Sequence, residues 1–136
     1  MVEKEFSYPT REQIIEANRR AVSLSGDPFG ILNSATLDHI ASAVRYKYSR
    51  NPPEEALCLK AAFVFVTLAG PGHVFIEGNK RTAVSVLLSF LEANKSGIVP
   101  VEREKMADLA MLVACGKVTQ SGIYRWLKER VKTTEV

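Results

Sequence analysis

Residues 54–69 constrain the fold more than any other segment, because they are apolar almost all round a helix. Lys60 is the only charged residue after the first turn of this segment. A helix that is apolar on every side has to be covered on every side, so it belongs at the centre of a core. Gly70-Pro71-Gly72 ends the segment. The sequence therefore predicts a central helix enclosed by the rest of the chain.

A second mostly buried helix is predicted over residues 79–94. Its polar positions form a narrow stripe on an otherwise apolar cylinder, and they are Thr82, Ser85, Ser89 and Glu92. Two consecutive buried helices joined by a Gly-rich loop make a rigid scaffold. On such a scaffold a loop side chain can be both firmly held and accessible.

Two helices are predicted before the central one. Thr10 caps the first, which Gly26-Asp27-Pro28 ends, and Ser34 caps the second. Asn51-Pro52-Pro53 stops the second helix and starts the next. Apolar residues recur at helical spacing in both, namely Ile14, Ala17, Ala21 and Leu24, then Leu37, Ile40, Ala41, Val44 and Tyr48.

Two more helices follow a short extended piece at residues 98–101. One is amphipathic and ends near Gly116, and Thr119 caps the other. Their inward residues are Met106, Leu109, Ala110 and Val113, then Ile123, Trp126, Leu127 and Val131. We predict an all-α fold of about six helices in a single domain spanning residues 1–136, with an N-terminal extension at 1–9 and a C-terminal tail at 132–136.

Charge and cysteine content exclude several classes of protein. The chain has 18 Lys and Arg against 15 Asp and Glu, interspersed along its length, and a net charge of +3 is too small to indicate direct nucleic-acid binding. No signal-peptide core and no membrane-spanning apolar run is found, so we expect a cytoplasmic protein with no membrane association. Cys58 and Cys115 stand alone in apolar helical stretches and are predicted to be reduced core residues.

Chemistry-bearing residues gather immediately before the helix at 79–94. The stretch reads His73-Val74-Phe75-Ile76-Glu77-Gly78-Asn79-Lys80-Arg81. Gly78 permits a tight turn, Asn79 can cap the helix, and Lys80 and Arg81 then lie in its first turn, where free backbone N–H groups favour an anion. Phe75 is expected to turn into the core while His73 and Glu77 face a cleft. A lone His in a loop is more often a surface residue, so the prediction rests on the whole group.

This stretch resembles the signature of the Fic/Doc superfamily, and specifically its Doc (death-on-curing) branch. Fic proteins usually carry Gly-Asn-Gly-Arg and a second arginine three residues later, whereas this chain has Gly78-Asn79-Lys80-Arg81 and then Val84. Both differences favour Doc. The resemblance implies a Fic/Doc-type helical bundle with the active-site loop between the two buried helices.

The resemblance also implies an activity. A Doc-type protein transfers the terminal phosphate of ATP to a Ser or Thr hydroxyl of a target protein, a translation elongation factor by family resemblance. His73 would be the general base. Glu77 would hold Mg²⁺, and Gly78, Asn79, Lys80 and Arg81 would bind the phosphates. Many Doc proteins have Asp at the position of Glu77 and Gly-Ile-Arg-Asp where this chain has Gly30-Ile31-Leu32-Asn33.

The resemblance also implies a partner, and two alternative functions stay open. The family implies a toxin restrained by a small antitoxin whose disordered tail folds into the toxin's groove. A Fic-type transfer of AMP is the first alternative to phosphate transfer. A degenerate Doc-fold protein that has lost catalysis and keeps only antitoxin or operator-complex binding is the second.

Overall fold

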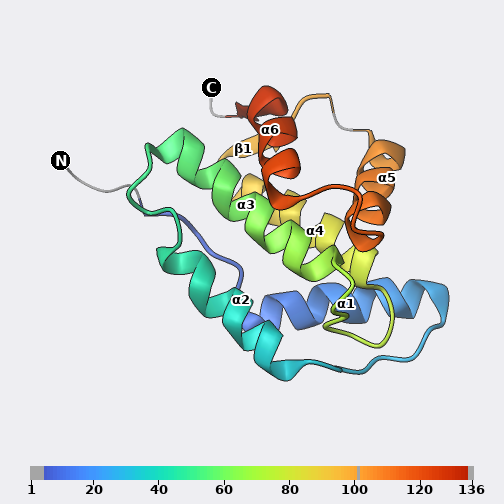
Figure 1. Ribbon diagram of the computed structural model, residues 1–136. Coiled ribbons are helices and arrows are strands. Elements are labelled where there is room, and N and C mark those ends of the chain that lie inside the picture. Colours follow the sequence, from blue (N-terminus) through green and yellow to red (C-terminus); the bar gives the residue numbers. More distant parts are fainter. Residues whose placement is uncertain (1–4, 101, 135–136) are drawn as a thin grey trace.

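Helices dominate the part of the chain that the computed structural model describes, which is residues 5–100 and 102–134 (Figure 1). These residues form six helices and one two-stranded sheet, so the predicted all-α fold is confirmed. The elements in chain order are α1 (Arg11–Ser25), α2 (Ser34–Tyr46), α3 (Pro53–Ala69), α4 (Asn79–Ala93), β1 (Ser96–Ile98), α5 (Arg103–Ala114), α6 (Gln120–Arg130) and β2 (Val131–Thr133).

The central helix is α3, as its apolar sequence predicts. It packs against α2, α4, α5 and α6, and in Figure 1 it runs between α6 and α2. Buried residues lie on all its sides, including Phe65 and Leu68, which have no exposed surface. α4 packs along α3 and also contacts α1 and α5. The loop between α3 and α4 is therefore held at both ends by core helices.

Helix ends agree with the sequence in most places. Thr10 forms a capping box with Gln13, Gly26 ends α1 with a left-handed φ of +75°, and Thr119 caps α6. The prediction of Ser34 as the cap of α2 is wrong, because the Asn33 side chain accepts the hydrogen bond from the backbone N–H of Thr36. Asn is at least as good a cap as Ser, so the helix begins one residue after it.

A small antiparallel sheet joins two segments that are far apart in sequence. Ser96 pairs with Thr133 and Ile98 with Val131. The extended piece predicted at 98–101 lies instead at 96–98, and residue 101 is outside the described residues. Part of the predicted C-terminal tail is strand β2. Three-residue strands are too short to show an alternating pattern, so the sequence gives no sign of them.

Residues 5–9 of the predicted N-terminal extension pack against the end of α4. The Asn94 side chain accepts a hydrogen bond from the Ser7 N–H at 2.8 Å and donates one to the Ser7 carbonyl at 2.9 Å. The Tyr8 ring stacks on Phe90 with 6.2 Å between centroids. This segment covers one end of the core.

The two cysteines have different environments. Cys58 is buried in α3 as predicted, and burial raises the pKa of its thiol to about 11. The prediction that Cys115 is a core residue is wrong, because it is exposed at the C-terminal end of α5. The apolar stripe of α5 leaves the core at that end, after Val113.

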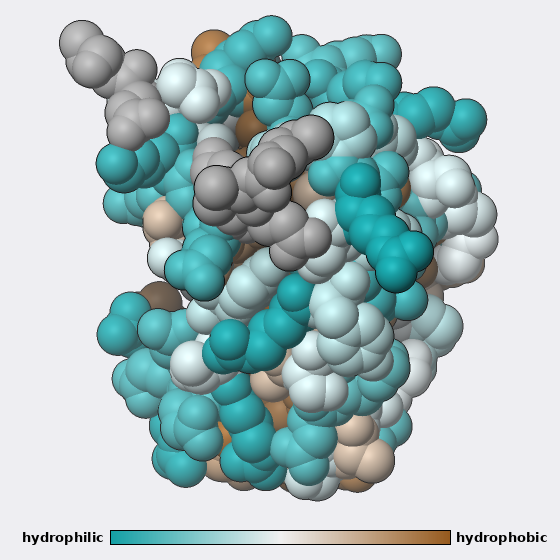
Figure 2. Space-filling model, turned by 90° about the vertical axis from the view of Figure 1, so that its left-hand side faces the viewer, coloured by the Kyte–Doolittle hydropathy of each residue, from teal (hydrophilic) through white to brown (hydrophobic). Residues whose placement is uncertain are grey.

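The molecular surface in view in Figure 2 is mostly hydrophilic, and apolar residues show through in small separate places. None of the helices in residues 5–100 and 102–134 has both the length and the apolar character that crossing a bilayer requires.

Lys60 is a fully buried cation in the middle of α3. Its Nζ donates to the carbonyl of Val44 at 2.7 Å, the carbonyl of Arg45 at 3.3 Å and the Ser49 hydroxyl at 3.1 Å. These carbonyls belong to the last turn of α2, whose dipole favours a positive charge. Burial lowers the pKa of Lys60. The ammonium group therefore closes α2 from inside the core.

Replacing Lys60 with Met is expected to lower the free energy of unfolding by about 2 kcal/mol, because the Val44 carbonyl loses its charged donor. Urea unfolding followed by circular dichroism measures the change. Lys117→Met is the control, since Lys117 is exposed, and it should change stability by less than about 0.5 kcal/mol. Similar small changes in both variants would show that the buried ammonium adds no net stability.

Candidate active site

The nine-residue motif includes most of the loop that joins α3 to α4, and its first residue has an unusual backbone. His73 has a φ of +40°, in the left-handed region that residues other than glycine seldom adopt. Its side chain is exposed. Such residues occur at functional sites and also in ordinary turns, and Tyr48 and Lys95 of this chain have a positive φ as well. The conformation of His73 therefore agrees with a functional role but does not by itself indicate one.

Phe75 anchors the loop in the core, as predicted, with none of its surface exposed. It forms an isolated antiparallel bridge with Ile31, and the flanking backbone bonds are Leu32 N–H to the Val74 carbonyl at 2.8 Å and Ile76 N–H to the Gly30 carbonyl at 2.9 Å. The first loop of the chain thus lies directly beside the motif. The two loops hold each other through main-chain hydrogen bonds.

Asn79 has a different role from the predicted one. Gly78 occupies the cap position with a φ of +76°, and Asn79 is the first residue of α4. The Asn79 side chain accepts a hydrogen bond from the Phe75 N–H at 2.9 Å and donates one to the Phe75 carbonyl at 2.8 Å. Both bonds to one residue close the turn between Phe75 and Asn79. They also fix which end of the amide is Oδ1 and which is Nδ2.

The same amide contacts His73. The Asn79 Nδ2 lies 3.3 Å from the His73 Nδ1. Since Nδ2 carries only donor hydrogens and already donates one of its two to Phe75, Nδ1 has to act as the acceptor. A neutral imidazole in this position then carries its proton on Nε2. Asn79 sets both the orientation and the tautomer of His73.

The start of α4 offers free hydrogen-bond donors. No side chain caps the helix, and within the described part of the chain no hydrogen bond is made by the backbone N–H groups of residues 78–81. Lys80 is exposed and has no carboxylate partner among these residues. Uncapped N–H groups, a helix dipole and a lysine together make a site for an anion such as phosphate.

Arg81 points toward α1 rather than toward Lys80. Its guanidinium donates to the Ala21 carbonyl at 2.8 Å and the Ser25 hydroxyl at 2.9 Å, and it pairs with Asp27 at 3.2 Å. The Ser25 hydroxyl, followed by Arg81, lowers the pKa of the Asp27 carboxyl group. The structure therefore places the guanidinium of Arg81 in a link between α4 and the end of α1.

Glu77 presents an exposed carboxylate beside the start of α4, and among the described residues its side chain has no ion pair or hydrogen bond. Residues 5–100 and 102–134 contain no cluster of three His, Cys, Asp or Glu side chains that could bind a metal ion by themselves. A single carboxylate is nevertheless enough for Mg²⁺ when phosphate oxygens and water supply the other ligands. The residues present fit a metal that arrives with a nucleotide.

Comparison with known proteins finds a similarity that covers most of the chain. No family model matches the chain. A curated protein named Protein kinase doc, from Escherichia phage P1, is 24% identical over 124 residues, which cover 91% of this chain and 95% of that protein. Similarity that runs along nearly the whole of both chains concerns the fold and not only a short motif. The comparison supports a distant relationship to the Doc family.

The chain departs from the Doc-type pattern in the loop before α2. The chain has Leu32 and Asn33 where many Doc proteins carry Arg and Asp. Asn33 caps α2, a role for which Asp serves equally well. Leu32 is 62% exposed, so the apolar side chain stands in solvent beside the motif loop. The substitution changes the surface around the site and leaves the cap in place.

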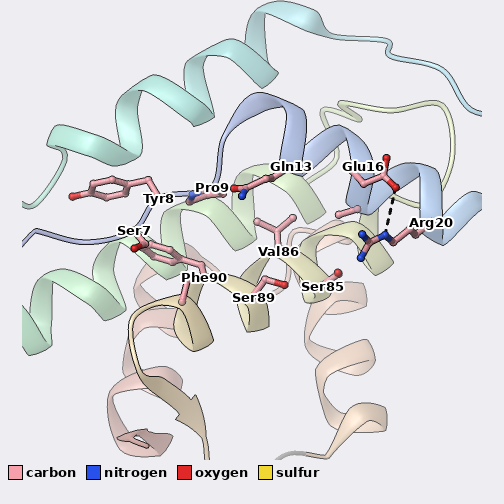
Figure 3. A pocket seen from close by; sticks show the side chains of 12 residues that line it. Ser7, Tyr8, Pro9, Gln13, Glu16, Arg20, Ser85, Val86, Ser89 and Phe90 are labelled. Atoms are coloured by element: carbon pink, nitrogen blue, oxygen red, sulfur yellow. Dashed lines mark ion pairs between the residues drawn. The ribbon is translucent and has the colours of Figure 1, made fainter. Parts of the chain in front are cut away.

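A hollow of about 280 Å³ lies near this site but contains none of the motif residues (Figure 3). Residues 7–9, α1 and α4 line it, and Figure 3 shows Ser85 and Ser89 of α4 together with the ion pair of Glu16 and Arg20. Two residues of the polar stripe predicted on α4, Ser85 and Ser89, therefore border this hollow. Neither His73 nor Glu77 lines this hollow.

Sequence reasoning missed Asn18, which holds the motif from α1. Its side chain is fully buried and donates to the Glu77 carbonyl at 2.8 Å and the Thr82 hydroxyl at 3.0 Å. A signal was present, because Asn18 lies in the i, i+4 row formed by Ile14 and Val22, the buried face of α1. A polar residue in such a row has to find a partner inside the protein.

Gly78 is the residue on which the turn before α4 depends. A Cβ atom there would lie 3.1 Å from Val22 Cγ1 and 3.2 Å from Asn18 Nδ2, in addition to the positive φ. Gly78→Ala is expected to destabilise the protein by about 2 to 3 kcal/mol, the sum of backbone strain and crowding.

Gly116→Ala is the matched control, because Gly116 has a φ of +73° and open space around its Cβ position. It should cost only the backbone term of about 1 kcal/mol. Urea unfolding of the two variants measures the difference. Equal losses would mean that the contact between Gly78 and α1 is not tight.

Proposed function

We propose that this Doc relative is a protein kinase, the toxin of a toxin–antitoxin pair, which transfers the terminal phosphate of ATP to a Ser or Thr hydroxyl. The observation that carries the proposal is the run of free N–H groups at residues 78–81 with Lys80 beside them and His73 exposed at the other end of the same loop. Phosphoryl transfer depends mainly on positioning and on stabilising charge, and these groups supply both. The name of the phage relative agrees with it.

In the proposed reaction the target hydroxyl oxygen forms a bond to the terminal phosphorus while the bond from phosphorus to the bridging oxygen breaks. ADP leaves, and the hydroxyl proton passes to His73 as general base. His73 can accept that proton only through a ring nitrogen with a free lone pair. With Nδ1 bonded to Asn79 and the proton on Nε2, the exposed ring has to turn away from Asn79 first.

The phosphate cradle consists of residues of the loop and of the first turn of α4. Gly78, Asn79, Lys80 and Arg81 contribute their backbone N–H groups, and the Lys80 ammonium adds a mobile positive charge. Glu77 would hold Mg²⁺, which neutralises charge on the phosphate oxygens. The Arg81 guanidinium is paired with Asp27, so Arg81 would take part in the cradle through its backbone N–H. Gly78 also lets the backbone make the turn without a side chain in the way.

The proposed partners follow from the same assignment. The target is a protein with an accessible Ser or Thr, and by family resemblance a translation elongation factor is the first to test. A toxin of this kind requires a cognate antitoxin, whose disordered segment would fold on binding.

His73→Ala is expected to lower phosphate transfer at least about 100-fold, the usual contribution of a general base, and to leave the thermal midpoint nearly unchanged. Stability is preserved because the side chain is exposed and alanine leaves the backbone strain as it is. The measurement is intact mass and phosphosite analysis of elongation factor incubated with the protein, ATP and Mg²⁺. Cys115→Ser, an exposed position at the end of α5, is the control that should keep full activity.

A gain of one phosphate that requires His73 establishes the kinase. A gain of AMP would assign the Fic-type reaction instead. No modification of any candidate target, together with no binding of nucleotide by the wild-type protein, would leave the binding-only alternative.

Lys80→Gly tests which end of the nucleotide is transferred. The Doc-type orientation depends on a lysine at this place, so phosphate transfer should fall by at least about tenfold, the loss expected when one charge-assisted contact is removed. Mass analysis of the same target then looks for a gain of AMP, which a glycine at this place would permit. Phosphate transfer at the wild-type rate would show that Lys80 does not orient the nucleotide.

A further inference from the structure

Asn18 forms hydrogen bonds through only one end of its side-chain amide among the described residues. The side chain is fully buried in α1, and its Oδ1 has no hydrogen-bond partner among the described residues. A buried acceptor without a partner costs free energy, which the two hydrogen bonds donated from the other end of the amide offset. The neighbours in the same row, Ile14 and Val22, are apolar. The other end of the amide must therefore have the more important role.

The Nδ2 of Asn18 bridges the two sides of the Gly78 turn. It donates to the Glu77 carbonyl, immediately before Gly78, and to the Thr82 hydroxyl in the first turn of α4. No other donor to the Glu77 carbonyl is present in the described part of the chain. Asn18 is thus what holds this carbonyl toward α1.

The direction of that carbonyl decides the direction of the cradle. In a trans peptide the N–H of Gly78 points opposite to the C=O of Glu77, because the two share one plane. With the carbonyl held against α1, the Gly78 N–H points away from α1 and joins the free N–H groups of residues 79–81. A reversed peptide would place an oxygen among these donors and repel a phosphate.

We propose that Asn18 is a positioning residue that sets the Glu77–Gly78 peptide for phosphate binding. This inference rests on the proposed function for its purpose, whereas the positioning itself can be tested without nucleotide. Asn18 would not touch the substrate itself. It acts through the main chain of the motif, and it also places the Glu77 side chain, which leaves the backbone next to the held carbonyl.

The test compares Asn18→Leu and Asn18→Asp with Ile14→Ala. Leu keeps the size of the side chain without a donor, and Asp keeps its shape but turns an acceptor toward the Glu77 carbonyl. Ile14→Ala is the control for destabilisation of the same helix, because Ile14 is fully buried one turn earlier and is outside the motif contacts. All proteins are studied below the unfolding temperature of the least stable variant.

Amide exchange of the nucleotide-free proteins gives the first readout. The N–H groups of Phe75 and Ile76 are hydrogen-bonded in the loop and report on its order. Both Asn18 variants should exchange these amides at least about tenfold faster relative to amides of α3, the effect of losing one hydrogen bond in the turn. Ile14→Ala should leave that ratio unchanged. Equal ratios in all three variants would overturn the proposal.

Calorimetric titration with Mg-ATP gives the second readout. Affinity should fall about tenfold in the Asn18 variants and stay within about twofold of wild type in Ile14→Ala. Loss of affinity in all three variants would reduce Asn18 to a structural residue. Wild-type protein that fails to bind Mg-ATP would contradict the proposed function, and faster loop exchange in the Asn18 variants would still support the positioning role.

Discussion

The double hydrogen bond between the Asn79 side chain and the backbone of Phe75 is the interaction on which the site depends. It uses both ends of one amide, so it closes the turn in a single register. Phe75 is buried, which makes the bond rigid and shields it from water. The His73 ring contacts the Asn79 side chain, and the free N–H groups of α4 begin at the same residue. One side chain thereby connects the loop that carries His73 to the start of α4.

α1 braces this turn from outside the motif. Asn18 holds the Glu77 carbonyl, and Arg81 reaches back to the last turn of α1 and to Asp27. The guanidinium of Arg19 lies 4.1 Å from the centroid of Phe29, whose ring lies 6.3 Å from that of Phe75. The first helix thus contacts both loops of the site. Some of the polar residues of α1 therefore contact the motif and the first loop instead of facing only solvent.

The sequence predicts what depends on local pattern. The apolar circumference of α3 and the caps at Thr10 and Thr119 follow from residues near in sequence, and they were predicted correctly. The motif itself was visible for the same reason. Contacts between segments that are far apart in sequence cannot be predicted in this way. Asn18 and Glu77 are separated by 59 positions, and β1 and β2 pair through only three residue pairs. The role of Asn79 was missed because its side chain bonds backward to Phe75, whereas capping rules consider the helix that follows.

The charges around the turn indicate which charged groups a ligand of this site needs. The N–H groups of residues 78–81 and Lys80 attract an anion, yet Glu77 exposes a carboxylate beside them without a cation of its own among the described residues. A triphosphate placed there would repel Glu77 at short range, which a site built only for anions would avoid. A divalent cation between the carboxylate and the phosphate oxygens turns this repulsion into two attractions. In the proposed kinase, Glu77 therefore makes binding of the nucleotide depend on the metal, and the residues of the site are complementary to the metal–nucleotide complex rather than to ATP alone.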